Sequence, residues 1–444
     1  MNINIPDDVN CIINKLEEHG YEAYAVGGCV RDILMGRSPK DWDVCTSALP
    51  EQMTEVFKGK RIIETGLKHG TITLMIDKNP YEITTYRVDG KYSDNRRPDN
   101  VKFVNVLKRD LARRDFTINA MAFNPKTGLV DYYNGQQDLI NKKIKCVGNP
   151  DKRFREDALR IMRAIRFASE LEFTIETDTL ESIYNNQPLL RNIAAERTAI
   201  EINKLLLGNK PGTTMFQYYR VLGEIIPEIL PMVGFEQNTP YHCYDVFTHS
   251  LQSVDNSPTD IKIRLTMLFH DIGKPHCYTE DENGVGHFYG HPAISVKLAE
   301  KILKRLKYDN DTIQTVSELI LYHDADIRAS HKNIRKWLNR IGEERYRQLL
   351  QVKTADCMAQ TYDLREKRRT DIENIIFELD EVIAQQQCFS LKNLAVNGRD
   401  LVSSGIPEGV IIGKILNKLL DLVINEEVEN NKDQLIDKIK NSPF

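Results

Sequence analysis

Two aspartates, Asp41 and Asp43, stand one residue apart near the start of the chain and are the first side chains suited to chemistry. On a strand, residues i and i+2 point to the same face, so the two carboxylates would lie side by side. Paired carboxylates can hold two hard divalent cations, which activate a hydroxyl and stabilise a leaving phosphate. Asp324 and Asp326 repeat the spacing, so an exposed turn is the alternative.

A glycine pair lies upstream of these aspartates. Gly27 and Gly28 follow an apolar run and precede a predicted helix over 29–36, which carries Arg31. Glycines let a triphosphate approach the backbone, a helix N-terminus favours anions, and arginine adds positive charge. The pattern indicates a phosphate site, whereas an isolated Gly-Gly pair would indicate only a turn.

Two further segments carry groups that a nucleotide site needs. Glu82, in the predicted strand 81–87, can supply a third carboxylate, although it can equally face solvent. In the sequence RRD, Arg113 and Arg114 can bond phosphate while Asp115 accepts a hydrogen bond from a ribose hydroxyl. The alternative for this segment is a surface charge cluster before a buried helix.

A possible base-reading pair lies farther along. Asp157 and Arg160 are three residues apart, so we expect them on one face of a helix, with Arg163 and Arg166 continuing the row. Cytosine and adenine both present an amine donor beside a ring-nitrogen acceptor, which match a carboxylate and an arginine. Guanine and uracil present the reverse pattern and would be rejected. A solvated face with ion pairs is the alternative.

The C-terminal half contains a second set of metal-ligating side chains, each on or beside a predicted helical stretch. The set comprises His249, His270, Asp271, His291, His323 and Asp356. Histidine combined with carboxylate suits a transition metal, and an adjacent His-Asp pair can serve one ion while nearby histidines serve another. A lone helical histidine is more often a packed or surface residue.

The elements that must position these groups change character near residue 150. Alternating segments at 71–76, 81–87 and 101–106 predict strands of one sheet, whereas apolar residues from 158 onward follow helical spacing. We therefore predict an α+β head with a small mixed sheet, followed by an all-α body. The predicted segments are 1–150 (head), 151–235 (helical neck), 240–365 (second metal domain) and 366–444 (helical tail).

Bulk properties bound the partners. The 444 residues include 60 basic and 64 acidic side chains, so any RNA surface must be a local patch. Such patches are predicted where basic residues cluster, although solvated helix faces are the alternative: Lys332, Arg335, Lys336 and Arg340, and Arg365, Lys367, Arg368 and Arg369. The eight scattered cysteines, the acidic N-terminus and the lack of a long apolar run predict a soluble cytoplasmic protein without a membrane span.

Six segments, in this order, resemble the class II tRNA nucleotidyltransferases and bacterial poly(A) polymerases. They are GGCVRD (27–32), DWD (41–43), YEITTYR (81–87), DGKYSDNRRPDNVKF (89–103), RRDFTINAMA (113–122) and EDALRIMRAIRFA (156–168). The resemblance covers about residues 20–205 and implies a polymerase-β-like head with Mg²⁺ on Asp41 and Asp43. It also implies triphosphate contacts from Gly28 and Arg31, sugar recognition by 113–115, and base selection by the Glu156-Asp157-x-x-Arg160 motif.

Two further expectations come from resemblance. In this family a loop at 89–100 is needed to add A, and here it looks complete, which favours full CCA or A addition over CC addition. The order H…HD…H…H…D, with LFHDIGKP as its most specific piece, resembles the HD-superfamily phosphohydrolases. That implies metal-dependent hydrolysis of a phosphoester, for instance a 2′,3′-cyclic or terminal phosphate, with Mn, Ni, Co or Fe.

The interpretation that unites these features is template-independent addition of C, C and A to the 3′ end of tRNA from CTP and ATP. Its closest rival keeps the chemistry but changes the product, as in an A-adding enzyme or a poly(A) polymerase. A phosphohydrolase with a nucleotide-sensing head and a non-catalytic tRNA-binding module are two further alternatives. No feature indicates an obligate protein partner.

Overall fold

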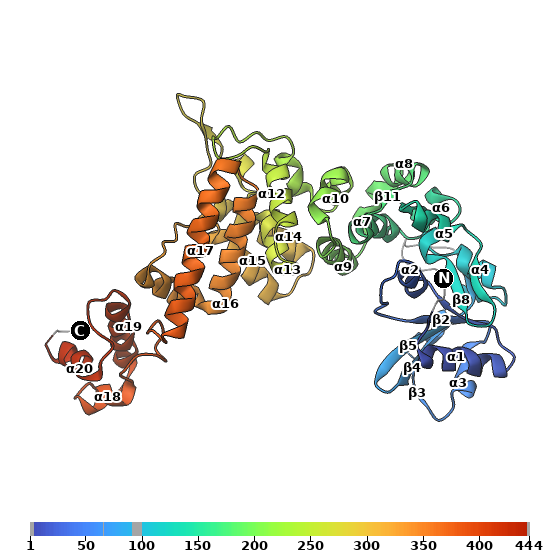
Figure 1. Cartoon of the computed structure of the whole chain (residues 1–444), viewed down its shortest axis with the longest axis horizontal. Coiled ribbons are helices and arrows are strands. Elements are labelled where there is room, and N and C mark those ends of the chain that lie inside the picture. Colours follow the sequence, from blue (N-terminus) through green and yellow to red (C-terminus); the bar gives the residue numbers. More distant parts are fainter. Residues whose placement is uncertain (1–3, 65, 91–99, 442–444) are drawn as a thin grey trace. The chain divides into compact units, whose positions relative to one another are not determined.

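The N-terminal part of the chain is built on a seven-stranded sheet (Figure 1). The computed structural model describes residues 4–64, 66–90 and 100–441. The strand order is β3-β4-β5-β2-β1-β8-β9; β2 and β5 are parallel, and the other neighbouring pairs are antiparallel. The strands are β1 (Ala23–Val26), β2 (Asp43–Thr46), β3 (Arg61–Ile63), β4 (Thr71–Ile76), β5 (Asn79–Thr85), β8 (Met121–Asn124) and β9 (Gly128–Asp131).

Helices cover both faces of this sheet because its strands alternate between two cores. Ala25 and Val44 belong to a core that also includes α1 (Asp7–Glu18) and α3 (Pro50–Val56). Their chain neighbours Val26 and Cys45 point the other way, into a core with Leu107 and Leu111 of α4 (Leu107–Ala112). A strand that is buried on both faces must be apolar at successive positions, as β1 and β2 are.

The prediction of one sheet from 71–76, 81–87 and 101–106 is wrong for the last segment. The strand β5 ends at Thr85, and β6 (Arg87–Asp89) pairs with β7 (Val101–Phe103) in a separate two-stranded sheet. The reason is that β2 ends at Thr46, whose carbonyl accepts from the backbone N–H of Tyr86, so pairing with β2 does not continue into β6. Most of the 89–100 loop, residues 91–99, lies outside the described residues.

Helices dominate from residue 135 onward in this first unit. They are α5 (Gly135–Ile140), α6 (Pro150–Glu156), α7 (Leu159–Leu171), α8 (Thr177–Asn186), α9 (Ala195–Leu206), α10 (Pro211–Gln217) and α11 (Tyr219–Gly223). The apolar spacing that predicted α7 is confirmed, since Ile161, Met162 and Ile165 are fully buried. The expectation of a purely α-helical body is wrong in two places, because β10 (Lys143–Ile144) pairs with β11 (Thr174–Ile175) and β12 (Thr279–Glu280) pairs with β13 (Gly286–His287).

The chain divides into two compact units, residues 1–227 and 228–444. The second unit contains α12 (Val246–Asp255), α13 (Ile261–Phe269), α14 (His291–Arg305), α15 (Asn310–Tyr322), α16 (His331–Met358), α17 (Tyr362–Ala384), α18 (Gly398–Ser403), α19 (Val410–Ile424) and α20 (Lys432–Lys440). Helix α16 is kinked at Gly342, whose φ is 76°. Among the described residues, no helix is long and apolar enough to cross a membrane.

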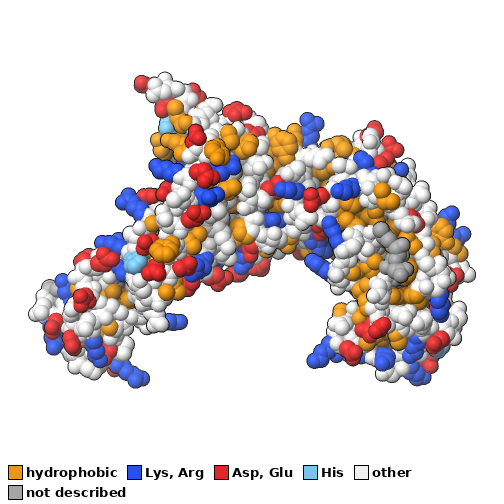
Figure 2. All heavy atoms as spheres, viewed as in Figure 1, with side chains coloured by type: hydrophobic (Ala, Val, Ile, Leu, Met, Phe, Trp, Pro, Cys, Tyr) orange, Lys and Arg blue, Asp and Glu red, His pale blue; other side chains and the backbone are white. Residues whose placement is uncertain are grey.

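The predicted fold class is confirmed: an α+β head precedes helical segments. On the face shown in Figure 2, Lys and Arg side chains are interspersed with Asp and Glu. This mixing agrees with the near balance of charge in the sequence.

Candidate active site and metal centre

Asp43 and Glu82 are neighbours across the only parallel strand pair of the seven-stranded sheet, as described. Asp43 opens β2, and its register partner on β5 is Glu82. Both side chains are exposed, while Tyr81 and Ile83 on either side of Glu82 are buried. The prediction that Glu82 supplies a carboxylate from an adjacent strand therefore agrees with its position. Asp41 precedes the strand, so the alternation rule that we applied to it does not hold there.

The charges around Asp43 make its ionisation costly. The surrounding protein shields the Asp43 carboxylate from part of the solvent, which raises its pKa. Glu82 and Asp41 raise this pKa further, whereas Arg114 lowers it. Asp43 and the two carboxylates that raise its pKa form a donor set that a divalent cation would stabilise. The residues present therefore fit Mg²⁺.

The Gly27-Gly28 turn lies against an arginine of the predicted nucleotide site. Gly27 adopts φ of 86°, and a Cβ built there would lie 2.9 Å from Nη1 of Arg114. Helix α2 (Gly28–Leu34) begins at the next residue. A larger residue at 27 would be strained by its backbone and would displace the guanidinium. The turn and Arg114 thus form one positively charged corner.

Arg31 is held by a buried residue that the sequence reasoning missed. Its Nη1 donates to Oδ1 of Asn119 at 2.7 Å, and Nδ2 of Asn119 donates to Oδ1 of Asp115 at 3.2 Å. Oδ2 of Asp115 accepts from Nε of Arg163 at 2.8 Å. A signal was present, because Asn119 is a lone polar side chain inside an apolar run, and buried polar groups need partners.

Asp115 is already fully engaged in this chain of bonds. It is 8% exposed, and Oδ1 also accepts from the backbone N–H of Phe116 at 2.8 Å. Burial alone would raise the pKa of Asp115, but Arg163 outweighs burial and holds it well below its usual range. A ribose hydroxyl must therefore share or replace an existing partner of Asp115.

Asp110 organises the two arginines that precede Asp115. It is completely buried, accepts from Nε of Arg113 at 2.9 Å and lies 3.6 Å from Nη2 of Arg114. It also accepts from the backbone N–H of Arg87, at the start of β6. The sequence reasoning did not single out Asp110, although an acidic residue at i−3 and i−4 from two arginines is a usable signal.

The prediction that Asp157 and Arg160 share one helical face is wrong. Asp157 caps the end of α6 in an extended conformation, and α7 begins two residues later. Its Oδ1 accepts from the backbone N–H of Leu159 at 3.1 Å, and its Oδ2 lies 2.9 Å from Nη2 of Arg197 on α9. Asp157 therefore acts as a cap that interrupts the helix, and Arg197 is a partner we did not predict.

The predicted arginine row is divided among different acidic partners. Arg160 donates to Oε2 of Glu156 at 2.9 Å and to the carbonyl of Arg113 at 3.0 Å. Arg166 pairs with Glu201 at 2.9 Å, while Arg163 pairs with Asp115. Because Arg160 and Arg166 are both buried, they are not a solvated face.

The six side chains of the second predicted metal set come together in the second unit, and we call them the HD centre. They are His249, His270, Asp271, His291, His323 and Asp356. Two groups are close enough to hold a metal ion: His249, His270 and Asp271, and Asp271, His291 and His323. Asp356 lies 2.8 Å from Nε2 of His249, beside the first group.

The four histidines share one hydrogen-bonding pattern. Three of them bond through Nδ1 to the carbonyl three residues earlier, at 2.8 Å (His270), 2.9 Å (His291) and 2.7 Å (His323). His249 uses Nδ1 to reach the carbonyl of Ala359 at 3.2 Å. A carbonyl can only accept, so each Nδ1 carries a proton and each Nε2 is the atom turned toward the carboxylates of the centre, where its unprotonated form can bind a metal ion.

The Nε2 atoms face one another in two pairs. Nε2 of His270 lies 3.4 Å from Nε2 of His249, and Nε2 of His291 lies 3.2 Å from Nε2 of His323. Two lone pairs at such distances repel unless a cation lies between them, and histidines oriented through their other nitrogen are usual metal ligands. The donor set therefore fits a transition metal at each pair.

Asp271 lies between the two histidine pairs. Its Oδ2 is 3.2 Å from His270 and 3.6 Å from His249, and its Oδ1 is 3.3 Å from His291 and 3.6 Å from His323. One carboxylate can thus serve two ions. Although burial lowers the pKa of His270, Asp271 and Asp356 raise it to about 10, which reflects a strong local demand for positive charge.

The basic clusters predicted to contact phosphate are partly used inside the fold. Lys332 and Arg335 donate to the carbonyls of Asn425 and Ile424, at the C-terminal end of α19, at 2.9 and 3.3 Å. Cations are favourable at a helix C-terminus. Arg368 donates to Gln360 at 2.6 Å, and Gln360 in turn donates to Asp356 at 3.1 Å.

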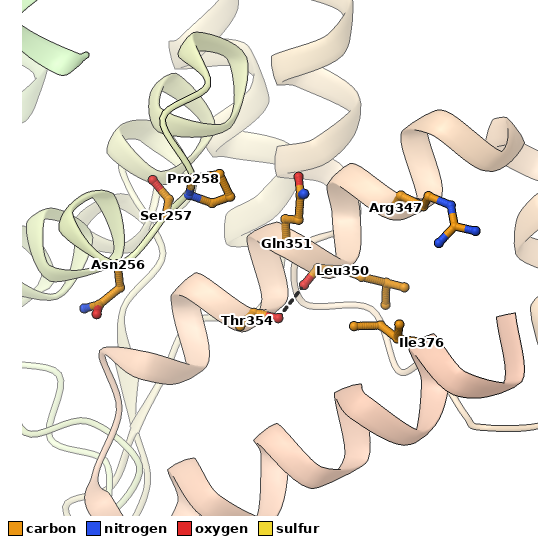
Figure 3. A pocket seen from close by; sticks show the side chains of 8 residues that line it. All are labelled: Asn256, Ser257, Pro258, Arg347, Leu350, Gln351, Thr354 and Ile376. Atoms are coloured by element: carbon orange, nitrogen blue, oxygen red, sulfur yellow. Dashed lines mark hydrogen bonds between the residues drawn. The ribbon is translucent and has the colours of Figure 1, made fainter. Parts of the chain in front are cut away.

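A cavity of about 520 Å³ lies between the end of α12, α16 and α17 (Figure 3). Its wall combines Leu350 and Ile376 with polar side chains, including Arg347, which is paired with Glu343 and Asp380. No residue of the HD centre lines it. We assign this cavity no part in either site.

Comparisons with known proteins show which family the chain resembles. Three family models match: "Poly A polymerase head domain" over 23–145, "Probable RNA and SrmB- binding site of polymerase A" over 172–232, and "tRNA nucleotidyltransferase domain 2 putative" over 291–439. A CCA-adding enzyme of Limosilactobacillus reuteri is 35% identical over 97% of this chain and 95% of its own length. One from Geobacillus kaustophilus is 34% identical over 96% of this chain and 94% of its own length.

Solved structures show the same likeness. The crystal structure of the Bacillus stearothermophilus CCA-adding enzyme in complex with CTP aligns with a TM-score of 0.70 and 30% identity, covering 97% of this chain and 95% of that one. The Thermotoga maritima CCA-adding enzyme complexed with tRNA aligns with a TM-score of 0.61 at 19% identity, covering 99% and 96% of the two chains, which shows a shared fold.

Proposed function

The chain belongs to the CCA-adding enzyme family, and we propose which of its residues perform the template-independent addition of C, C and A to the 3′ end of tRNA. The substrates are CTP, ATP and the tRNA end. The assignment rests on the register that pairs Asp43 with Glu82. These two carboxylates lie side by side on neighbouring strands at the start of β2, and Asp41 precedes that strand by two residues.

Asp41, Asp43 and Glu82 would hold Mg²⁺, which supplies activation of the tRNA 3′-hydroxyl and stabilisation of the leaving pyrophosphate. The corner formed by Gly27, Gly28 and Arg114 would receive the triphosphate. Arg31 supports this corner through Asn119, and Arg113 shares the carboxylate of Asp110 with Arg114. The sugar would bond to Asp115.

Base selection would fall to Asp157 and Arg160. The carboxylate of Asp157 accepts from the exocyclic amine of C or A, and Arg160 donates to the ring nitrogen. Arg197 orients Asp157 through an ion pair, and Glu156 orients Arg160 in the same way. Because Arg160 already bonds to Glu156 and to the carbonyl of Arg113, contact with a base requires it to add to or exchange these bonds.

One incubation tests the product. A tRNA that ends at the discriminator base is given CTP alone, then CTP and ATP, and its 3′ end is sequenced. CCA addition predicts two C residues with CTP and a terminal A only when ATP is present. Incorporation of A without prior C would instead support the A-adding or poly(A) alternative.

We propose that separate segments carry separate functions, with boundaries at 1–150, 151–235, 240–365 and 366–444. Head and neck would carry nucleotidyl transfer, the third segment would carry the HD centre, and the tail would contact tRNA. Lys336 and Arg340 are exposed and could meet phosphates, whereas Lys332 and Arg335 are occupied at the end of α19.

A second activity is favoured by the HD centre, which we propose is a metal-dependent phosphoester hydrolase. Its support is the set of four histidine Nε2 atoms arranged around the two oxygens of Asp271. Mn, Ni, Co or Fe would suit imidazole and carboxylate together. The test is hydrolysis of a 2′,3′-cyclic nucleotide with each metal. His270→Ala should abolish this hydrolysis and leave nucleotide addition intact.

A further inference from the structure

His242 lies against the HD centre without belonging to either group of metal-ligating atoms. Its ring packs edge-on against His249, with ring centroids 4.7 Å apart and ring planes at 86°. The segment that carries it is fixed from the other side, because the carbonyl of Tyr241 accepts from the backbone N–H of Thr361, just beyond α16. The backbone therefore holds this imidazole at the edge of the site.

His242 differs from the four ligand histidines in the use of its ring nitrogen. Those four commit Nδ1 to a backbone carbonyl. Nδ1 of His242 is buried and has no hydrogen-bond partner in the described part of the chain. Leaving a buried polar atom without a hydrogen bond is unfavourable. The ring of His242 is therefore not oriented through Nδ1 as the metal-ligand histidines are. Its Nδ1 is available to bind a substrate or product.

The charged surroundings of His242 indicate which group that is. The titratable groups that act on it are Lys274, His249, Asp271 and Asp356. Lys274 is 5% exposed, and its ammonium lies 2.7 Å from Oδ2 of Asp271 and 2.8 Å from Oε1 of Gln237. Once metal ions neutralise the two aspartates, a buried ammonium remains on this side. An anion is the ligand that such a corner favours.

We propose that His242 binds the phosphoryl group of a phosphoester at the HD centre, with Nδ1–H donating to a non-bridging oxygen beside Lys274. The inference rests on the proposed hydrolase activity and adds a substrate contact to it. Phosphomonoesters and cyclic phosphodiesters both present such an oxygen, and so does inorganic phosphate, which is the product of phosphomonoester hydrolysis and a convenient probe. His242 acts on the substrate and leaves metal binding to the other histidines.

The test uses the full-length chain with Asp41→Ala and Asp43→Ala, so that the head carboxylates hold no metal. This parent is loaded with Mn²⁺, desalted and assayed for bound metal, and its affinity for inorganic phosphate is measured by calorimetry. We expect His242→Ala to bind as much metal as the parent. Its affinity for phosphate should be about 10-fold weaker, because one hydrogen bond to a charged group is lost. His242→Asn, whose amide can donate from a similar position, should recover part of the affinity.

His276→Ala is the matched control, because His276 is an exposed histidine nearby in sequence; it should change neither quantity. Loss of metal from His242→Ala would make His242 a ligand and overturn the inference. Unchanged phosphate affinity in His242→Ala would overturn it while leaving the hydrolase standing. If the Mn²⁺-loaded parent itself neither binds phosphate nor cleaves a 2′,3′-cyclic nucleotide, the hydrolase proposal fails, and the inference fails with it.

Discussion

Nη2 of Arg197 lies 2.9 Å from Oδ2 of Asp157, and this contact joins helix α9 to the turn between α6 and α7. The carboxylate proposed to read the base is therefore oriented by a residue 40 positions away in the chain. Its other oxygen is fixed by the backbone N–H of Leu159.

Removing the proposed reader should relax nucleotide choice. In Asp157→Ala the ratio of C and A incorporation to U and G incorporation should fall about 100-fold, and in Arg197→Met about 10-fold, because the carboxylate stays but loses its orientation. Single-turnover incorporation of each nucleotide measures both ratios. Arg191→Met is the control, since Arg191 makes a comparable pair with Glu224. Unchanged selectivity in Asp157→Ala would refute the assignment.

The ionised form of Asp43, which we propose is needed for catalysis, should lower the stability of the folded protein. Its folded-state pKa is raised, so the folded chain holds that proton more tightly than the unfolded chain, and stability falls as pH rises through this pKa. At neutral pH, Asp43→Asn should therefore abolish nucleotide incorporation yet raise the melting temperature by up to ~2 °C, a small effect because the side chain is exposed. Added Mg²⁺ should raise the melting temperature of the wild type but not of the variant. A variant that melts lower than the wild type without metal would contradict this account.

The Asp115–Arg163 pair predicts acid sensitivity of the opposite sign. The pKa of Asp115 is lowered in the folded state, so its stabilisation is present above the unfolded value near about 3.9 and is lost as pH falls toward the folded value. Asp115→Asn should cost about 2 kcal/mol or more at pH 7, because it leaves Arg163 without its partner. Urea unfolding at pH 7 and near pH 3 should show this difference shrinking in acid. Asp178→Asn, an exposed residue of α8, should show neither effect.

The position of Asp271 between two histidine pairs predicts different metal losses. Asp271→Asn should lose both ions, since each pair shares one oxygen of this carboxylate. His323→Ala should lose only the ion held with His291. Elemental analysis after desalting counts the ions. His331→Ala, whose imidazole pairs with Glu378 outside the HD centre, should retain both. Equal losses in Asp271→Asn and His323→Ala would show that the carboxylate is not shared.

Arg335 should anchor the tail. It bonds to Gln387 and Glu426 at 2.8 and 2.7 Å, besides the carbonyl of Ile424. In Arg335→Ala, amide exchange across α19 should quicken about 10-fold, as expected for the loss of roughly 1.4 kcal/mol of local stability. Lys336→Ala should leave this exchange unchanged. If Arg335 serves only RNA phosphates, exchange in the free protein would not respond to its removal.

Local patterns predicted well where one residue's role followed from its immediate neighbours. The strand 23–26, the glycine turn and the apolar face of α7 follow from alternation, from the freedom of glycine and from helical spacing. Each of these rules acts over a few residues. The six side chains predicted for the HD centre do lie together, and their order along the chain was the signal, because it resembles that of the HD superfamily.

Partners that are distant in the chain were beyond such rules. The Arg197–Asp157 and Arg31–Asn119 contacts join segments 40 and 88 residues apart, so only the folded chain creates them. The prediction that Asp157 lies on a helix was wrong for a different reason. Its side chain caps the backbone of α7, and a short acidic side chain that can bond to its own neighbourhood competes with helix formation, so spacing alone assigned it to the wrong element.

The alternation of β5 has a consequence for insertions and deletions. Tyr81, Ile83 and Thr85 are buried, and Glu82 faces the opposite side beside Asp43. A shift of pairing by one residue would turn Glu82 into the apolar core and bring a core side chain out beside Asp43. The same register thus fixes both the packing of this strand and the position of the carboxylate proposed for catalysis, so a chain paired out of register would lose both together. Change in this strand must come by substitution.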